Sequence, residues 1–118
     1  METTENQKNN QMITNLETLL AQGQDNALLR YSLGHAYLKT KQFERAQTHL
    51  AQALAFDAHY SAAWKSYAQA LELNNQLQEA IEAYTQGIAV AEHKGDKQVA
   101  KEMNVFLKRL QKRQGSSA

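Results

Sequence analysis

The sequence predicts an all-α fold of repeated helix pairs, and three observations carry that prediction. The chain of 118 residues contains no proline and only 5 glycines, so little interrupts long helices. Small and apolar residues recur at the spacing of a helix face. The same pattern returns after 34 residues, a period typical of stacked helix–turn–helix units. We therefore expect a helical solenoid of about six antiparallel helices.

The 34-residue period is clearest in three segments that place small or apolar residues at i, i+4, i+7 and i+8. The three sets are Met12, Leu16, Leu19 and Leu20; Ala46, Leu50, Ala53 and Leu54; and Ala80, Tyr84, Gly87 and Ile88. Between them lie two further helical segments in the same register, in which Gly34 corresponds to Ala68. Alternate helices of one repeating unit explain both series.

This pattern resembles the tetratricopeptide repeat, whose marks include Leu-Gly, Tyr, Ala and an aromatic residue at fixed positions. Repeats starting at Ala27 and Ser61 carry Leu33, Gly34, Tyr37, Ala46, Leu50 and Ala53, then Trp64, Tyr67, Ala68, Leu71, Ala80, Tyr84 and Gly87. Arg30 replaces the usual large apolar residue, and Ala58 replaces the usual proline. The whole chain is similar to small bacterial two-repeat proteins that end in a basic helix, here "KEMNVFLKRL". That resemblance implies a fold and no activity.

The elements follow in order from this register. We expect a disordered tail (1–9), one folded domain (10–114) and a second tail (115–118). The domain divides into a half-repeat helix (10–24), repeat 1 (27–60), repeat 2 (61–94) and a capping helix (95–114). The expected helices cover about 11–22, 26–40, 43–56, 58–73, 77–93 and 97–113.

Capping residues support these boundaries. Asp57 and Asp96 are predicted N-caps, and Gly23 and Gly95 suit the left-handed residue that ends many helices. Gly34 lies inside a helix, where glycine costs about 1 kcal/mol relative to alanine. We attribute it to a close helix crossing that a larger side chain would push apart. Because Ala68 takes the same repeat position, we expect alanine to be tolerated at position 34.

The last helix has two distinct faces. Its apolar face carries Val99, Met103, Phe106, Leu107 and Leu110, and its opposite face carries the lysine stripe, defined as Lys97, Lys101, Lys108 and Lys112. We expect a capping helix that closes the stack.

The resemblance implies that a partner binds the concave groove formed by the first helix of each repeat. The corresponding residues are Leu28, Tyr31, His35, Leu38, Lys39, Ala62, Lys65, Gln69, Glu72 and Leu73. Their mixed apolar and polar character suits a peptide or helical segment. Some family members hold chaperone C-terminal carboxylates with Lys and Asn at two of these positions. Lys65 and Gln69 imitate that pair, but Tyr31 and His35 do not.

The charge distribution allows a second interpretation. The net charge is +1, but residues 1–92 carry 6 basic and 10 acidic side chains (−4), and residues 93–118 carry 7 and 2 (+5). The lysine stripe therefore serves either as a nucleic-acid or polyanion site or as the solvated face of the cap. The stripe has no interleaved aromatic residues and the rest of the chain is acidic, which favours the second interpretation.

The sequence favours an adaptor over an enzyme. It has no cysteine, no glycine-rich phosphate loop, and four histidines without metal-ligand spacing, so we expect no catalytic residue, metal or cofactor. No leader pattern and no apolar run of about 20 residues are present, which favours a cytoplasmic location without a membrane partner. We expect a protein or peptide partner and no nucleic acid. Two full repeats are few for a free-standing array, so we expect a monomer or a weak homodimer.

Overall fold

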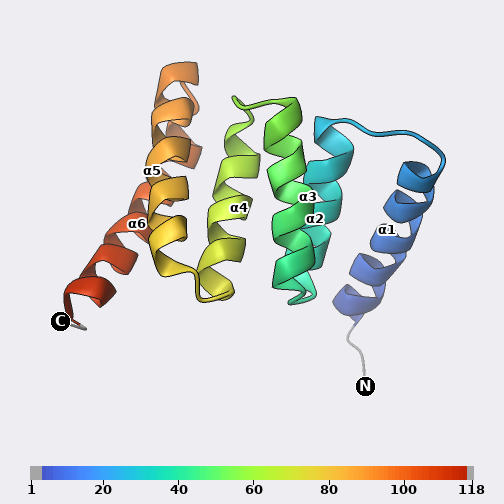
Figure 1. Cartoon of the computed structure of the whole chain (residues 1–118), viewed down its shortest axis with the longest axis horizontal. Coiled ribbons are helices and arrows are strands. Elements are labelled where there is room, and N and C mark those ends of the chain that lie inside the picture. Colours follow the sequence, from blue (N-terminus) through green and yellow to red (C-terminus); the bar gives the residue numbers. More distant parts are fainter. Residues whose placement is uncertain (1–3, 117–118) are drawn as a thin grey trace. The chain divides into compact units, whose positions relative to one another are not determined.

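The structure, a computed structural model, describes residues 4–116, and six α-helices occupy this range in sequential antiparallel pairs (Figure 1). They are α1 (Thr4–Ala21), α2 (Ala27–Lys39), α3 (Phe43–Phe56), α4 (Ser61–Leu73), α5 (Leu77–Lys94) and α6 (Lys97–Ser116). The predicted all-α fold is confirmed. The chain divides into two compact units between Ala58 and His59, two residues before the predicted boundary between the repeats. Unit 1 contains α1–α3, and unit 2 contains α4–α6.

Unit 1 is built on the pair formed by α2 and α3, with α1 packed against α2. The side chain of Asn26 caps α2 by accepting a hydrogen bond from the Leu29 backbone N–H at 2.8 Å. Leu33 and Tyr37 are buried on α2, and they face a helix whose Leu50 is also fully buried. By contrast, no residue of α1 is fully buried, so α1 covers the pair without contributing a core of its own.

Gly34 lies at the close crossing of α2 and α3, as predicted. A Cβ atom added there would stand 2.5 Å from Leu50 Cγ and 3.2 Å from the carbonyl oxygen of Ala46. Both neighbours are fully buried, and one of the contacting atoms belongs to the backbone. The space beside Gly34 is narrower than a methyl group requires, so an alanine there needs a shift of Leu50 or of the α2–α3 crossing. The tolerance of alanine at position 34 stays a prediction.

Unit 2 has a continuous core in which α6 covers α5. Tyr84, Met103 and Leu110 are almost completely buried, and Phe106 and Leu107 pack against this core while remaining partly exposed. Gly87 is tightly enclosed: an added Cβ would lie 2.7 Å from Trp64 Cβ and 2.8 Å from Met103 Sδ. The predicted apolar face of the capping helix is confirmed.

The turns after α1, α2, α4 and α5 share one geometry. Gly23, Lys41, Asn75 and Gly95 each have a positive φ, between 63° and 91°. The residue after each donates its backbone N–H to the carbonyl five positions earlier, at 2.8–3.1 Å. Glycine adopts this conformation freely and asparagine does so readily, but for other residues it costs about 1–2 kcal/mol. Lys41 is therefore the strained member of the set.

Three helix boundaries differ from the prediction. The first helix begins at Thr4 instead of about Gln11, so residues 4–9 are helical; 1–3 lie outside the described residues. The polar composition of this segment suggested a tail. However, nothing breaks the helix, and contacts one turn apart, such as Gln11 Nε2 to Asn15 Oδ1 at 3.1 Å, support it. At the other end α6 continues to Ser116, beyond the predicted end at Arg113.

The start of α4 is the third difference. The helix begins at Ser61 instead of Ala58, and Asp57 does not cap it. Instead, the Asp57 backbone N–H donates to the Ala53 carbonyl at 2.9 Å and ends α3. A proline at position 58 would preset a helical φ, and without it residues 57–60 form a turn. Asp96, by contrast, directly precedes α6 as predicted, and its carbonyl accepts from the Ala100 N–H at 3.1 Å.

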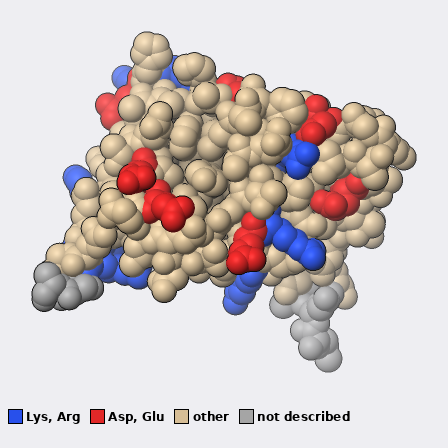
Figure 2. Space-filling model, in the orientation of Figure 1, with Lys and Arg blue, Asp and Glu red and all other residues tan. Residues whose placement is uncertain are grey.

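Charged groups are dispersed over the face seen in Figure 1. Uncharged side chains cover most of that face in Figure 2, with acidic and basic groups scattered among them. No continuous basic patch is visible there.

Candidate peptide-binding surface

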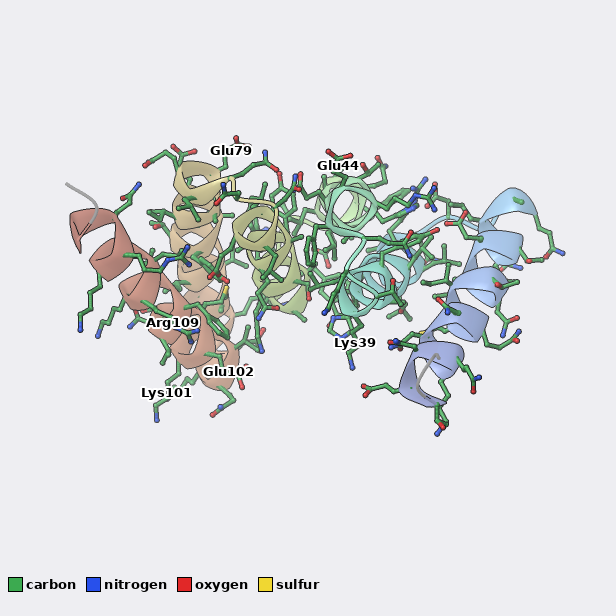
Figure 3. The ribbon with its side chains drawn as sticks, turned by 90° about the horizontal axis from the view of Figure 1, so that it is seen from below. Lys39, Glu44, Glu79, Lys101, Glu102 and Arg109 are labelled. Atoms are coloured by element: carbon green, nitrogen blue, oxygen red, sulfur yellow. The ribbon has the colours of Figure 1, made fainter. Side chains whose placement is uncertain are left out.

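The predicted groove residues of unit 1 gather along one side of α2, which we call the α2 face (Leu28, Tyr31, His35, Leu38 and Lys39). Tyr31 and His35 lie one turn apart and stack, with ring centroids 5.7 Å apart and an interplanar angle of 21°. Leu28 is 65% exposed, whereas Tyr31 and Leu38 are half-buried. Figure 3 shows Lys39 on the side of unit 1 away from Glu44 of α3. The α2 face thus offers aromatic and aliphatic surface next to hydrogen-bonding groups.

Lys65, the predicted groove cation of unit 2, is paired within the chain. Its Nζ donates to Glu102 Oε1 of α6 at 2.7 Å, and this hydrogen bond lowers the pKa of the Glu102 carboxyl. Both side chains are partly exposed, so solvent screens the pair and it contributes little to stability. A lysine already bound to a carboxylate is poorly placed to hold a ligand carboxylate, which weighs against a chaperone-type clamp. Gln69, its predicted companion, is half-buried on α4.

The carboxylate of Glu72, like that of Glu102, contacts other side chains of the same unit. Its Oε1 accepts a hydrogen bond from the Tyr84 hydroxyl at 3.0 Å, and its Oε2 lies 3.6 Å from Arg113 Nη1. Burial, followed by the negative charge of Glu72, raises the pKa of Tyr84. Glu72 therefore ties α4 to α5 and α6, and its carboxylate is committed to this structural role.

A hollow of about 250 Å³ lies between α4 and α6, which we call the α4–α6 groove. It is lined by Lys65, Glu102, Val105, Phe106 and Arg109. Val105 is 57% exposed, and the Arg109 guanidinium lies over the Phe106 ring at 5.1 Å from its centroid. Figure 3 shows Glu102 and Arg109 on the side of unit 2 opposite Glu79.

Sequence reasoning missed four of these groove residues. Glu102, Val105, Phe106 and Arg109 follow one another at i, i+3, i+4 and i+7, which is the spacing of one helix face. That spacing could have indicated the groove. The prediction divided α6 into an apolar face that packs on the core and the lysine stripe on the opposite face. Val105 belonged to neither of them.

The four lysines of the lysine stripe are all exposed, as predicted. They occupy the part of α6 that the core of unit 2 leaves open, and Lys101 projects outward in Figure 3. Their placement allows both interpretations given above, a solvated cap and a polyanion site.

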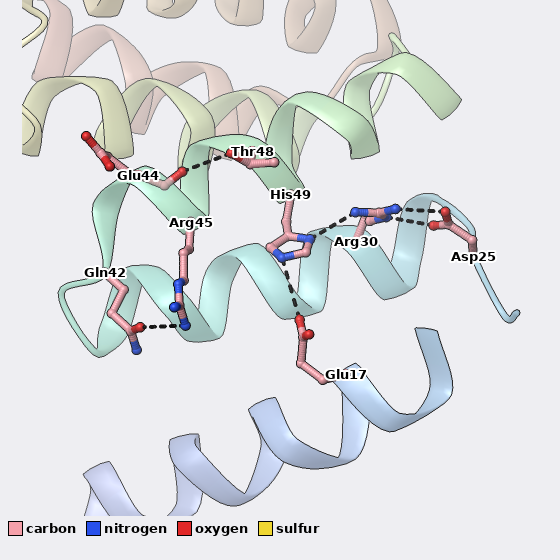
Figure 4. A network of polar contacts seen from close by, with 8 residues as sticks. All are labelled: Glu17, Asp25, Arg30, Gln42, Glu44, Arg45, Thr48 and His49. Carbon is pink, nitrogen blue, oxygen red and sulfur yellow. Dashed lines mark hydrogen bonds and ion pairs between the residues drawn. The ribbon is translucent and has the colours of Figure 1, made fainter. Parts of the chain in front are cut away.

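His49, which is partly buried, belongs to a polar network that joins the three helices of unit 1 (Figure 4). Arg30 forms two hydrogen bonds with Asp25, at 2.7 and 2.9 Å, and its Nη1 lies 3.1 Å from His49 Nδ1. Because arginine can only donate, Nδ1 accepts, and the neutral ring carries its proton on Nε2, 3.6 Å from Glu17 Oε1. Burial lowers the pKa of His49, and Glu17 opposes that effect.

This network explains the departure of Arg30 from the repeat pattern. The guanidinium replaces a large apolar residue and binds groups from the loop before α2 and from α3. His49 also stacks on Tyr37, with centroids 5.4 Å apart. The arrangement holds helices together and leaves no open, activated nucleophile.

Residues 4–116 show neither a metal-binding cluster nor a membrane-spanning helix. In this range no three His, Asp or Glu side chains stand close enough together to bind a metal ion. None of its helices combines the length and apolarity that a membrane crossing needs.

Helix pairs with a period of 34 residues define a helical repeat protein. A sequence profile of the tetratricopeptide repeat family matches residues 5–70, more than half of the chain. The chain belongs to the tetratricopeptide repeat family.

Relatives support this assignment over nearly the whole length. The TPR repeat-containing protein PA0015 of Pseudomonas aeruginosa is 48% identical over 99 residues, which cover 84% of this chain and 94% of that protein. The solution structure of protein BPP2914 from Bordetella parapertussis is 41% identical with a TM-score of 0.77, covering 96% of this chain and 91% of that one. The Sgt2 TPR domain from Aspergillus fumigatus has a TM-score of 0.69 at 21% identity and coverages of 98% and 82%, a likeness of fold alone.

Proposed function

We propose that the chain is a non-enzymatic adaptor that binds a peptide or helical segment of a partner protein. Tetratricopeptide repeat domains are generally protein-interaction modules. The observation that carries the proposal is the α4–α6 groove, where Val105 and Phe106 present apolar surface between the Lys65–Glu102 pair and Arg109. The α2 face provides a second contact surface, centred on Tyr31 and His35.

The chemistry of the groove suggests which side chains it would take. Exposed apolar surface enclosed by polar groups is typical of a binding site, and desolvated apolar contacts supply most of the affinity. Arg109 stacks on Phe106, and no carboxylate pairs with it among the described residues. A partner segment with a bulky apolar residue next to an acidic residue would therefore satisfy both features of the groove.

A comparative capture experiment tests the proposal. Lysate of the source organism is passed over the immobilised wild-type chain and over two variants, and bound proteins are identified by mass spectrometry. Val105→Asp places a charge in the α4–α6 groove, whereas Ala89→Asp places the same charge on an exposed site of α5 and is the matched control. A partner retained by the wild type and by Ala89→Asp but lost by Val105→Asp is the expected result. Equal retention by all three proteins would contradict groove binding.

The same material separates the adaptor from a polyanion-binding protein. Replacement of the four stripe lysines by Gln should leave partner binding unchanged. If the captured ligand is nucleic acid that is released steeply between low and moderate salt, and if the Gln variant loses it, the lysine stripe is the site. We place the adaptor in the cytoplasm, with which its lack of cysteine is consistent.

A further inference from the structure

A second hollow, of about 390 Å³, is lined in unit 1 by residues of the start of α1 and of the turn between α2 and α3. Figure 1 shows that these two segments lie at the same end of the unit. Its lining is entirely polar and consists of Asn6, Asn10, Lys39, Thr40, Lys41 and Gln42. A polar hollow of this volume favours a polar occupant over an apolar one. The two ammonium groups give the lining a charge of +2, and no carboxylate offsets it there.

The two lysines are available to a ligand. Within residues 4–116 neither Lys39 nor Lys41 takes part in an ion pair, whereas Arg30 and Lys65 are paired with Asp25 and Glu102. Lys39 is the last residue of α2, and Lys41 follows two positions later in the turn. The helix end and the turn therefore fix where both backbones lie.

The repeat does not require these lysines. Residues 34 positions later, Leu73 and Asn75, take the corresponding places in unit 2. Asn75 adopts the same backbone angle as Lys41, with φ of 63° in both. Asparagine, which suits a positive φ, is therefore compatible with this turn. Unit 1 carries Lys41 there instead, although lysine is strained at that φ.

The amide groups complete a set of donors. Asn6 and Asn10 are one turn apart on α1 and line the same hollow as the lysines of the α2–α3 turn. Lysine and asparagine side chains that line one hollow match a ligand with several acceptor oxygens and more than one negative charge.

We propose that this hollow, the α1–turn pocket, binds a small phosphate-type oxyanion, either inorganic phosphate or the phosphate group of a small monoester. Lys39 and Lys41 supply the charge, and Asn6 and Asn10 orient the oxygens. This site is separate from the α4–α6 groove and needs no protein partner.

Nuclear magnetic resonance titration of the full chain tests the site. Sodium phosphate and glycerol 2-phosphate are added separately at constant ionic strength, with acetate as the carboxylate comparison. We expect saturable shifts of the Thr40–Gln42 amides and the Asn6 and Asn10 side-chain amides with both phosphates. Saturation by inorganic phosphate alone would identify the free ion as the ligand, and tighter binding of the ester would identify a monoester. Equal binding of acetate would overturn the assignment to phosphate.

Two variants locate the site. Lys41→Asn removes the charge and keeps a residue that suits the turn, so it should fold at least as well as the wild type. We expect it to bind phosphate at least about fivefold more weakly, because one charge-assisted hydrogen bond is lost. Lys108→Gln on α6 makes the same change of charge away from the pocket and should bind like the wild type. Unchanged affinity in Lys41→Asn, or shifts confined to α6, would overturn the proposal.

Discussion

Substitution of Gly34 measures how closely α2 and α3 cross. In Gly34→Ala the new methyl group meets Leu50 Cγ at 2.5 Å and the Ala46 carbonyl oxygen at 3.2 Å. Overpacking of this kind costs about 1–3 kcal/mol, and the change from glycine to alanine in a helix returns about 1 kcal/mol. The expected net effect is a loss of about 1 kcal/mol in the free energy of unfolding, and Gly34→Leu should lose at least about 3 kcal/mol.

Urea denaturation followed by far-UV circular dichroism gives these free energies. Ala51→Gly, at an exposed site on α3, measures the glycine penalty without a packing change. Leu50→Ala removes the clashing side chain, so the cost of Gly34→Ala should shrink or reverse in that background, with a coupling of about 0.5–3 kcal/mol. The reasoning is refuted if Gly34→Ala stabilises the wild-type chain, or if the two substitutions are additive.

Three further predictions concern a turn, the capping helix and the partly buried His49. Lys41→Asn should stabilise the chain by about 0.5–1 kcal/mol in the same urea assay, since it relieves the positive φ; a loss of stability would show that the lysine supports the turn. Ending the chain after Gly95 removes the buried Met103 and Leu110, each contributing about 1.5–3 kcal/mol, and should lower the melting temperature by about 10 °C or more. Neutralising the lysine stripe should change the melting temperature by less than about 2 °C. If truncation lowers the melting temperature less than neutralisation does, α6 is a detachable tail. Because burial lowers the pKa of His49 in the folded state, the unfolded chain binds more protons below about pH 6.5, so stability present above that pH should decline as the pH falls; a decline of the same size in His49→Gln would assign it to other groups.

The sequence predicted the helices best where apolar residues repeat. Leu33, Tyr37 and Leu50 are buried because the 34-residue pattern places each on the face that meets the paired helix. The start of α1 was missed because residues 4–9 are polar, and an exposed helix of this kind has no apolar periodicity to reveal it.

The site was less predictable, because its contacts join residues distant in the chain. Lys65 and Glu102 are 37 residues apart, and Glu72 meets both Tyr84 and Arg113. Periodicity assigns each residue to a helix face. It does not identify the opposite side chain, which depends on how closely α6 approaches α4. The same limit applies to the α1–turn pocket, whose lining comes from two segments about 30 residues apart.

Leu107 has a consequence for how such a chain can lengthen. In the register of α6 it takes the place that Gly34 and Ala68 hold in α2 and α4, and its side chain packs on the core of unit 2. In arrays of this kind each repeat contacts its neighbours, and at Gly34 the close crossing of two helices depends on a small residue. A helix placed after α6 would lie against the larger side chain of Leu107 instead of a glycine or an alanine. We therefore expect an array engineered to continue past α6 to need Leu107→Gly or Leu107→Ala before a new helix pair can join.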